Sequence, residues 1–515
     1  MFHQLISHDQ HIGFFFCHHS ITMASSAAKF TVTATHVVKS EHQITLQAPF
    51  LLGPLDQLYH FATPVTAVWF YESPGTSLVP LERLHKAISR LLDYYPHLTG
   101  RLHIDPGTNV RTVDRLGTGV HLLEALCDAT LQSFASRSSK PGGELNIFDF
   151  QGYGNALLAP WDLTLEGAMQ QPLFSIQRTE FADSAVAIGM RLSHVVSGAK
   201  GFLGLYQDLA EIYRAIDDPA ASRGPIELTA PPHIHPFMVE KMQHMDVEEK
   251  KKALSEGPGG YPLRDSQSAA AAPDERKGKD GSQRELNKDP FVGRGLRFSA
   301  SAIATLKQQA ADPNDSSSRV SSFTALTAHL WQRIHRARAA HARTLPEDER
   351  SAYSKSIYGT SVDFTRHFRR PERSFGNTFV SRAVELDSSK LEQARPWEIA
   401  KIIKDLVRHV SLDETRQLGS WIAAQPKKSD IKLGFNFNTP TLLITIGWHS
   451  FPFYSGAELE VAPTFASPIF MESLSPGMVC FVESKDGGLE AIASLTASTW
   501  ALLDADEEFI TTWDK

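Results

Sequence analysis

The spacing of apolar residues in the first half of the chain predicts helices that alternate with strands. Over residues 80–92 apolar side chains recur every three or four positions, which is typical of a helix packed on a core. Residues 185–196 (AVAIGMRLSHVV) form a mostly apolar run that predicts a buried strand, and the small polar residues 197–201 end it. An amphipathic helix is predicted over 202–213. His194 is therefore expected near the carboxyl end of a strand.

A polar segment separates this region from a second set of predicted strands and helices. Residues 255–283 contain Gly, Pro, Ser, Ala and charged residues and almost no large apolar side chain, so they cannot pack a core. We interpret them as a mobile part of a crossover over 231–290, and a partner-binding loop is the alternative. Beyond it, the pattern predicts helices near 300–306, 322–337 and 397–410, and strands near 295–299, 441–446, 477–483 and 489–495.

The length of the chain favours two domains, because 515 residues exceed what one hydrophobic core usually organises. We expect an α/β fold with one domain over 23–230, which contains His194, and a second over 291–515. The alternating run Phe30–Val38 is typical of a first strand. Residues 1–22 are then a disordered extension or the result of a mispredicted start codon, with a weak targeting segment as the alternative.

Composition and charge exclude several classes of protein. The formal net charge is -7 and no run of Lys and Arg stands out, so nucleic acid is not an expected partner. The three cysteines lie far apart without a C-x-x-C pair, which argues against a disulfide framework and a zinc site and favours the cytoplasm. No stretch approaches the roughly 20 apolar residues that span a bilayer, so we expect a soluble protein without membrane contact.

The best-known catalytic motifs are absent from the sequence. There is no Gly-x-Ser-x-Gly elbow, Walker loop, His-Glu-x-x-His pair or dinucleotide-binding glycine turn. The histidines at 60, 121, 329 and 449 lack metal-ligand spacing and are interpreted as scattered surface or packing residues. We therefore expect no metal and no bound cofactor.

Several short segments carry a resemblance to a known family through their order and spacing. They are LGPLDQ at 52–57, YPHLTGRL at 95–102, RLSHVVSGAKG at 191–201, LRFS at 296–299, SFTALTAHLW at 322–331, VD at 362–363, FGN at 375–377, and Trp448 with FPFY at 451–454. Over most of residues 28–510 the chain resembles the fungal branch of the BAHD acyltransferases, which includes trichothecene 3-O-acetyltransferases. This branch belongs to the chloramphenicol-acetyltransferase-like superfamily. The resemblance implies two such domains, each a mixed sheet with flanking helices, and a monomer.

The same resemblance implies an activity and a catalytic residue. In that family the histidine of an H-x-x-x-D motif lies between the domains and takes a proton from a hydroxyl or amine, which then attacks the thioester of acyl-CoA. His194 occupies this position, and imidazole suits the role because its pKa lies near neutral pH. The resemblance then implies acyl-CoA as a co-substrate and a small molecule of fungal secondary metabolism as the acceptor. The alternative for His194 is a partly buried histidine that only bonds to the backbone.

The sequence departs from the family pattern at the residues that usually support this histidine. Gly198 stands where the motif has aspartate, and Thr365 where its arginine partner belongs, although Arg366 is adjacent. Losing both partners together destabilises the fold less than losing one, because a single remaining charge would be buried without a partner. Ala457–Val461 replaces the D-F-G-W-G segment. The residues expected to support the pocket are Gly198, Asp363, Thr365, Asn377 and Trp448, with a simple turn as the alternative role of Asp363.

One further departure and a group of arginines leave other functions open. Gly447 replaces the small hydroxyl residue beside Trp448, with Thr445 and His449 as the nearby candidates for an oxyanion donor. The arginines within 333–343 are interpreted as a solvated helix face, and contact with CoA phosphates is the alternative. A repurposed fold member, acting as a cyclase, isomerase or hydrolase with His194, is the second hypothesis. A non-catalytic binding protein is the third.

Overall fold

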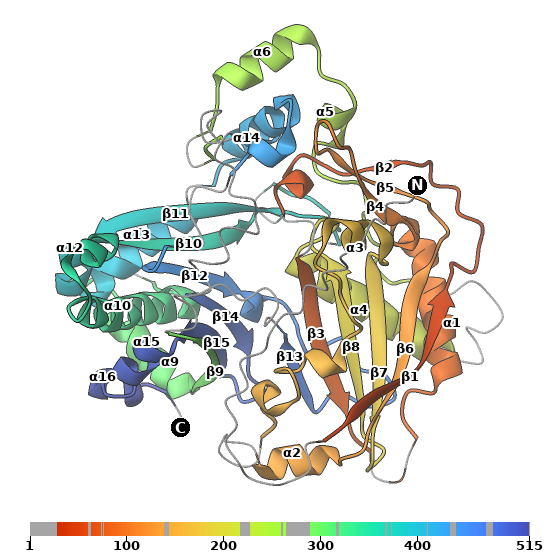
Figure 1. Ribbon diagram of the computed structural model, residues 1–515, viewed down its shortest axis with the longest axis horizontal. Helices are drawn as coiled ribbons and strands as arrows, with labels where there is room; N and C mark the ends of the chain where they lie inside the picture. The colour runs from red at the N-terminus through yellow and green to blue at the C-terminus, as the bar shows by residue number, and fades with distance from the viewer. Residues whose placement is uncertain are drawn as a thin grey trace, which may run out of the picture.

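The computed structural model describes residues 28–513, except 60–62, 74, 76, 138–143, 217–226, 259–260, 264–288, 316–318, 366–367, 372, 409, 433–438 and 470–476. The predicted extension over 1–22 and most of the polar segment over 255–283 lie outside the described residues. Two six-stranded mixed sheets lie side by side, each covered by helices (Figure 1). The predicted α/β fold with two sheet-containing domains is confirmed.

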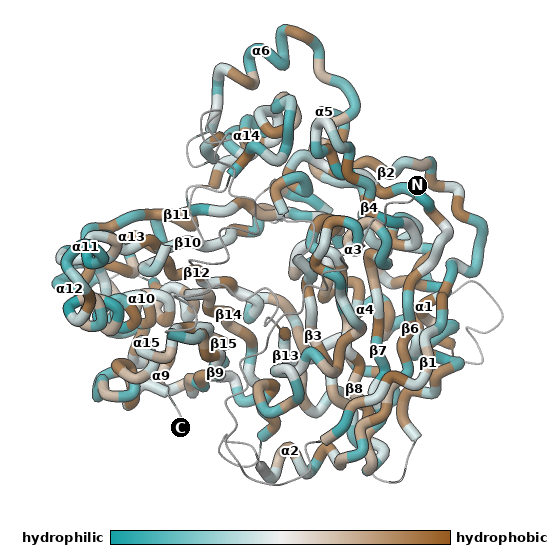
Figure 2. Tube along the Cα trace, viewed as in Figure 1, coloured by the Kyte–Doolittle hydropathy of each residue, from teal (hydrophilic) through white to brown (hydrophobic). Residues whose placement is uncertain are grey.

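The first sheet has the strand order β1-β6-β7-β8-β3-β13. Its strands are β1 (Phe30–Val38), β3 (Pro64–Tyr71), β6 (Val120–Cys127), β7 (Phe174–Phe181), β8 (Val186–Ser193) and β13 (Phe465–Pro468). One face carries alternate apolar residues such as Leu122, Ile176 and Ile188, which share a core with helices α1 (Leu81–Tyr94) and α4 (Ala199–Ile216). Figure 2 shows hydrophobic positions along β7 and β8.

One strand of the first sheet comes from the second half of the sequence. β13 pairs with β3 in antiparallel register, with Phe465 opposite Phe70 and Ala466 opposite Trp69. Beyond the paired residues, the Thr464 amide donates to the Phe70 carbonyl at 2.8 Å. The two halves of the chain therefore share a sheet (Figure 1).

The second sheet has the order β11-β10-β12-β14-β15-β9. Its strands are β9 (Phe291–Phe298), β10 (Lys355–Asp363), β11 (Phe379–Asp387), β12 (Leu442–Gly447), β14 (Met478–Glu483) and β15 (Leu489–Thr496). The helices on it are α9 (Ala300–Gln309), α10 (Ser322–Ala342), α12 (Ser388–Gln393), α13 (Pro396–Arg408), α15 (Ala497–Leu503) and α16 (Glu507–Ile510). The hydroxyls of Ser299 and Ser321 cap α9 and α10, so the predicted helix starts are confirmed.

Smaller elements complete the molecule. They are the three-stranded sheet of β2 (Phe50–Leu51), β5 (Arg111–Asp114) and β4 (Arg101–Ile104), and the helices α2 (Leu131–Arg137), α3 (Leu165–Gln170), α5 (Val239–Gln243), α6 (Val247–Ser255), α11 (Glu347–Arg350) and α14 (Leu412–Ala424). Helix α6 packs against α14 above the two sheets (Figure 1). No described helix is long and apolar enough to cross a membrane.

The arginines of α10 do not form the predicted solvated face. Arg338 is only 6% exposed, and its Nη1 donates to the Leu442 carbonyl at 2.9 Å, while burial lowers its pKa to about 10. Arg333 pairs with Asp506, at the start of α16, at 3.3 Å. Arg343, just past the end of the helix, is exposed as predicted. For Arg333 and Arg338 the prediction was wrong because elements distant in sequence cover this side of the helix, which helical periodicity cannot reveal.

Candidate active site between the two halves

His194 lies immediately after strand β8. Its amide donates to the Thr63 carbonyl at 3.0 Å, beside the start of β3. Four residues later the Gly198 carbonyl accepts from the Phe202 amide at 3.0 Å, inside the first turn of α4. The apolar strand and the helix with its apolar stripe thus fix both ends of the histidine loop, as the sequence pattern predicts.

The His194 ring lies between aromatic side chains of the two halves. It stacks on Tyr59 with ring centroids 4.5 Å apart and planes inclined by 10°. Phe379, the first residue of β11, lies 6.0 Å away in the second half. Burial lowers the pKa of His194, so its imidazole is neutral at neutral pH and can accept a proton. Among the described residues Nδ1 has no hydrogen-bond partner.

Asn377 and Asp56 hold the backbone of this loop. The Asn377 side-chain amide donates to the His194 carbonyl at 3.0 Å and to Asp56 Oδ1 at 2.8 Å. Asp56 also accepts from the amides of Asn377 and Gly53, and burial raises its pKa to about 6. Sequence reasoning selected Asn377 but missed Asp56, although LGPLDQ was among the segments that carried the resemblance.

The surroundings of Gly198 explain the absence of the motif aspartate. A Cβ at this position would lie 2.7 Å from Cε1 of Phe379, so any side chain needs that ring to move. At the arginine's expected position, the Thr365 hydroxyl donates to Asp363 at 3.1 Å, and the Thr378 hydroxyl donates to the same carboxylate at 2.8 Å. Asp363 therefore stabilises its own turn. Arg366 lies outside the described residues.

A different ion pair joins α4 to the second half. Asp208, with 1% of its side chain exposed, pairs with Arg373 and accepts from the Tyr95 hydroxyl at 2.5 Å. Arg373 also donates to the Gly204 carbonyl on α4 at 3.1 Å. Neither residue belongs to a motif recognised in the sequence, so nothing there indicated this contact. Arg373 lies four residues before Asn377 in the sequence. The ion pair therefore fixes α4 to the same segment whose Asn377 bonds to the His194 carbonyl.

The end of β12 supplies the other residues predicted for the pocket. Trp448 is buried, and its ring centroid lies 6.1 Å from that of Phe202. Thr445 is unsuited to be an oxyanion donor because its hydroxyl bonds to the Tyr358 hydroxyl at 2.8 Å deep in the sheet. His449 stacks on Phe323 with centroids 5.9 Å apart, and burial lowers its pKa.

The segment that replaces D-F-G-W-G packs against the first half. The Tyr71 hydroxyl donates to the Ala457 carbonyl at 2.6 Å, and Arg83 pairs with Glu460 at 3.4 Å. These two contacts join the segment 457–461 to the first half.

The remaining histidines that the sequence singled out are not brought together. His60 lies outside the described residues, His329 bonds to Thr512 at 3.0 Å, and His121 lies on the first sheet. Within the described part of the chain, no three His, Cys, Asp or Glu residues are placed to hold a metal ion.

Two mixed α/β halves that meet at His194 form the two-domain arrangement that the resemblance predicted. The chain belongs to the Transferase family, whose profile matches residues 28–510. The predicted BAHD-type resemblance is confirmed at the level of the family, and the fungal branch stays a prediction.

Known proteins support this membership. Acyltransferase GLAUCE of Arabidopsis thaliana is 24% identical over 313 residues, which cover 59% of this chain and 59% of that protein. The chain spans between 46% and 59% of the length of the first curated relatives that it matches.

Solved structures share the fold. The crystal structure of vinorine synthase has a TM-score of 0.65 at 15% identity, covering 94% of this chain and 99% of that one. The structure of F. graminearum TRI101 complexed with coenzyme A and deoxynivalenol has a TM-score of 0.64 at 15% identity, covering 91% and 99%. At this identity the likeness concerns the fold.

Proposed function

We propose that the protein transfers an acetyl or longer acyl group from acyl-CoA to a hydroxyl or amine of a small molecule, with His194 as general base. The observation that carries this proposal is the neutral His194 imidazole, held between the two halves by Tyr59 and Phe379. Membership of the Transferase family supports it, as does the structural neighbour TRI101, which was crystallised with coenzyme A and deoxynivalenol. An acceptor from secondary metabolism, a monomeric state and a cytoplasmic location remain predictions.

The reaction needs one proton carrier. A ring nitrogen of His194 takes the proton of the acceptor hydroxyl as the oxygen forms a bond to the thioester carbonyl carbon. The tetrahedral intermediate then breaks its carbon–sulfur bond, and the leaving CoA sulfur receives the proton from the imidazolium. Products are the ester and CoA, and His194 returns to its neutral form.

The missing motif pair is compatible with this role because backbone contacts hold the histidine. Asn377 bonds to the His194 carbonyl, and Asp56 fixes Asn377 from the first half. The loss of the motif aspartate therefore removes one support and leaves the proton acceptor.

Acyl transfer is tested with purified protein, acetyl-CoA and a panel of hydroxylated small molecules, by following CoA release and ester formation. We expect His194→Ala to lower the rate by about 100-fold or more, because a positioned base contributes this much. His103→Ala is the matched control, since His103 is an exposed histidine on β4. Equal rates in His194→Ala and the native protein would exclude the proposed mechanism.

A hydrolase, isomerase or cyclase that uses the same histidine is the second candidate. Gly198 favours it, because the motif aspartate is absent and Phe379 occupies the space beside the loop. The same panel incubated without acyl-CoA separates the two. Conversion that depends on His194 but not on acyl-CoA would assign the protein to this second class.

A further inference from the structure

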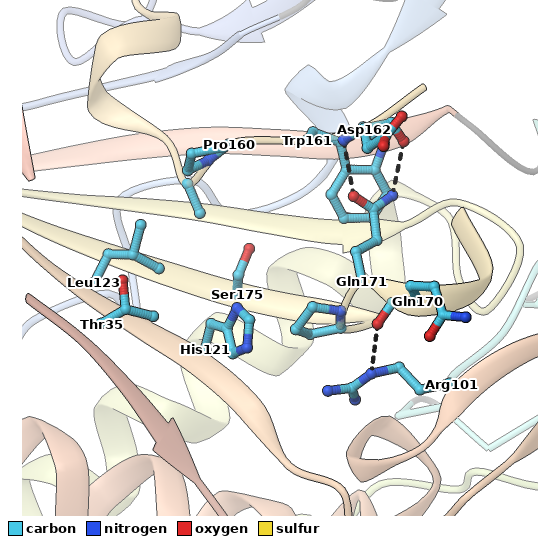
Figure 3. Close-up of a pocket in the computed structure, with 12 residues that line it drawn as sticks. Thr35, Arg101, His121, Leu123, Pro160, Trp161, Asp162, Gln170, Gln171 and Ser175 are labelled. Carbon is cyan, nitrogen blue, oxygen red and sulfur yellow. Dashed lines mark hydrogen bonds between the residues drawn. The ribbon is translucent and has the colours of Figure 1, made fainter. Parts of the chain in front are cut away.

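We propose that the outer face of the first sheet holds a binding site for a small organic carboxylate, separate from the His194 site. A cavity of about 520 Å³ lies there, between strands β1, β6 and β7 and the segment 159–172 (Figure 3). Its strand residues His121, Leu123 and Ser175 alternate with Leu122 and Ile176, which face α1 and α4, so the cavity lies on the opposite face.

Arg101 brings a buried positive charge to this cavity. It is 6% exposed, its Nε donates to the Gln170 carbonyl at 3.0 Å, and its Nη1 donates to the carbonyls of Gly100 and Gly119. No carboxylate of the described residues forms an ion pair with it, and Nη2 has no hydrogen-bond partner among them. A buried charge without a counter-charge is costly, so an anion bound here would be strongly stabilised.

Two neutral donors stand beside this arginine. His121 and Ser175 are directly opposite each other on β6 and β7. Burial, together with the Arg101 charge, lowers the pKa of His121, so its neutral ring keeps one N–H to donate. Ser175 is 4% exposed, and its hydroxyl has no partner among the described residues. A guanidinium, an imidazole N–H and a hydroxyl together match the acceptor oxygens of a carboxylate.

Asp162, the acidic residue on the cavity wall, packs against the start of helix α3. Asp162 Oδ1 accepts from the Thr164 amide at 2.8 Å, and a side chain at Gly167 on α3 would overlap its carboxyl group. The Gln171 side chain holds the Asp162 backbone through bonds of 2.9 and 3.0 Å, which Figure 3 shows. Asp162 therefore faces α3, and the charge of Arg101 stays uncompensated.

The rest of the cavity suits an apolar body. Leu123, Pro160, Trp161 and Pro172 line it, and its volume falls within the roughly 300–1,000 Å³ of small-molecule pockets. These features favour an aromatic or short aliphatic carboxylic acid, bound with its carboxylate toward Arg101. None of the lining residues is Tyr59, Asn377 or Phe379, which surround His194.

Calorimetric titration of the full chain with sodium benzoate, and with neutral benzamide as the matched analogue, tests this site. We expect benzoate to bind at least about tenfold more tightly than benzamide, because charge-assisted hydrogen bonds are the stronger ones. His121→Phe and Ser175→Ala each remove one donor and should weaken benzoate binding severalfold. His194→Ala should leave it unchanged.

Three results would overturn the proposal. They are no benzoate binding at all, equal binding of benzoate and benzamide, and loss of benzoate binding in His194→Ala. The last result would place the ligand in the acyl-transfer site instead. Thermal unfolding of each variant checks that it is folded, and Ser175→Ala, the smaller change, decides the matter if His121→Phe does not fold. Binding is measured without turnover, so the result is independent of whether the chain transfers acyl groups.

Discussion

At the scale of single residues, His194 depends on aromatic rings and a backbone clamp instead of a carboxylate partner. Tyr59 stacks on its ring and Phe379 lies beside it, while Asn377 fixes its carbonyl. The sequence predicted the position of His194 because a strand pattern and a small-residue loop surround it. Asp56 and Phe379 escaped prediction, because their contacts with the loop arise only when distant segments meet.

The environment of His194 sets the pH dependence of catalysis. Burial lowers its pKa from 6.5, so the neutral base persists below the pH at which an exposed histidine becomes protonated. We expect kcat/KM to fall with acid and to reach half its plateau below pH 6.5. A pH profile from about pH 5 to pH 8 measures this. A half-maximal point above pH 6.5 would contradict a desolvated base.

Phe379 leaves no room for a side chain at position 198, so restoring the motif aspartate alone is expected to destabilise the fold. Gly198→Asp brings both a steric clash and a buried charge without a partner, which together cost about 3 kcal/mol or more of unfolding free energy. Gly198→Ala is the matched control for the clash alone. Urea unfolding of both variants separates the two effects, and equal losses would show that the charge finds a partner.

Asp56 makes stability depend on pH in an unusual direction for a carboxyl group. Its pKa rises from 3.8 to about 6 in the folded chain, so the folded state binds more protons than the unfolded state between pH 4 and 6. The contribution of Asp56 to the free energy of unfolding therefore falls as the pH rises through this window, by about 3 kcal/mol.

Comparison with Asp56→Asn measures this effect, because asparagine keeps the size but does not titrate. The difference in unfolding free energy between the native chain and this variant should decrease from pH 4 to pH 7. A difference that stays constant, or one that grows with pH, would contradict the raised pKa.

At the scale of elements, α4 connects the histidine loop to the second half. The Asp208–Arg373 pair and the Tyr95 hydroxyl hold this helix near Asn377. The sequence predicted α4 itself from its apolar stripe. It could not predict the ion pair, because Asp208 and Arg373 are far apart in the sequence and nothing in their local pattern distinguishes them from surface charges.

Breaking this pair should cost more than breaking an exposed one. Asp208→Asn leaves Arg373 without its charge partner and is expected to lower the unfolding free energy by about 3 kcal/mol. A double-mutant cycle with Arg373→Met isolates the coupling between the two side chains. The matched control is Lys390→Met, which removes an exposed pair with Asp387 and should cost about 0.5 kcal/mol or less. Equal losses of unfolding free energy in Asp208→Asn and Lys390→Met would show that the buried pair stabilises the fold no more than an exposed one.

At the scale of the whole molecule, the two sheets were predictable but their sharing of a strand was not. Each half shows its own periodic strands and helices, which is why the two-domain α/β fold followed from the pattern. β13 is a four-residue strand, and its pairing with β3 depends on a contact between opposite ends of the chain. Short strands of this kind carry too little pattern to be assigned a partner.

The shared strand should make the halves interdependent. We expect a fragment of residues 28–258, which lacks β13, to leave the edge of β3 open and to aggregate or unfold when expressed alone. Adding the fragment 289–513 in the same cell should restore a soluble complex. Size-exclusion chromatography and limited proteolysis measure both outcomes. A monomeric, protease-resistant first fragment would show that β13 is dispensable.

The position of β13 also bears on how the chain folds while the ribosome makes it. About 390 residues separate the end of β3 from the start of β13, so synthesis at 5–20 residues per second leaves the β3 edge uncovered for roughly 20–80 s. During that interval β3 can pair with β8 on one side, but its other edge is unpaired and open to other chains. Its yield in a cell should therefore depend on chaperones that bind nascent chains, more than that of a protein whose domains close before translation ends.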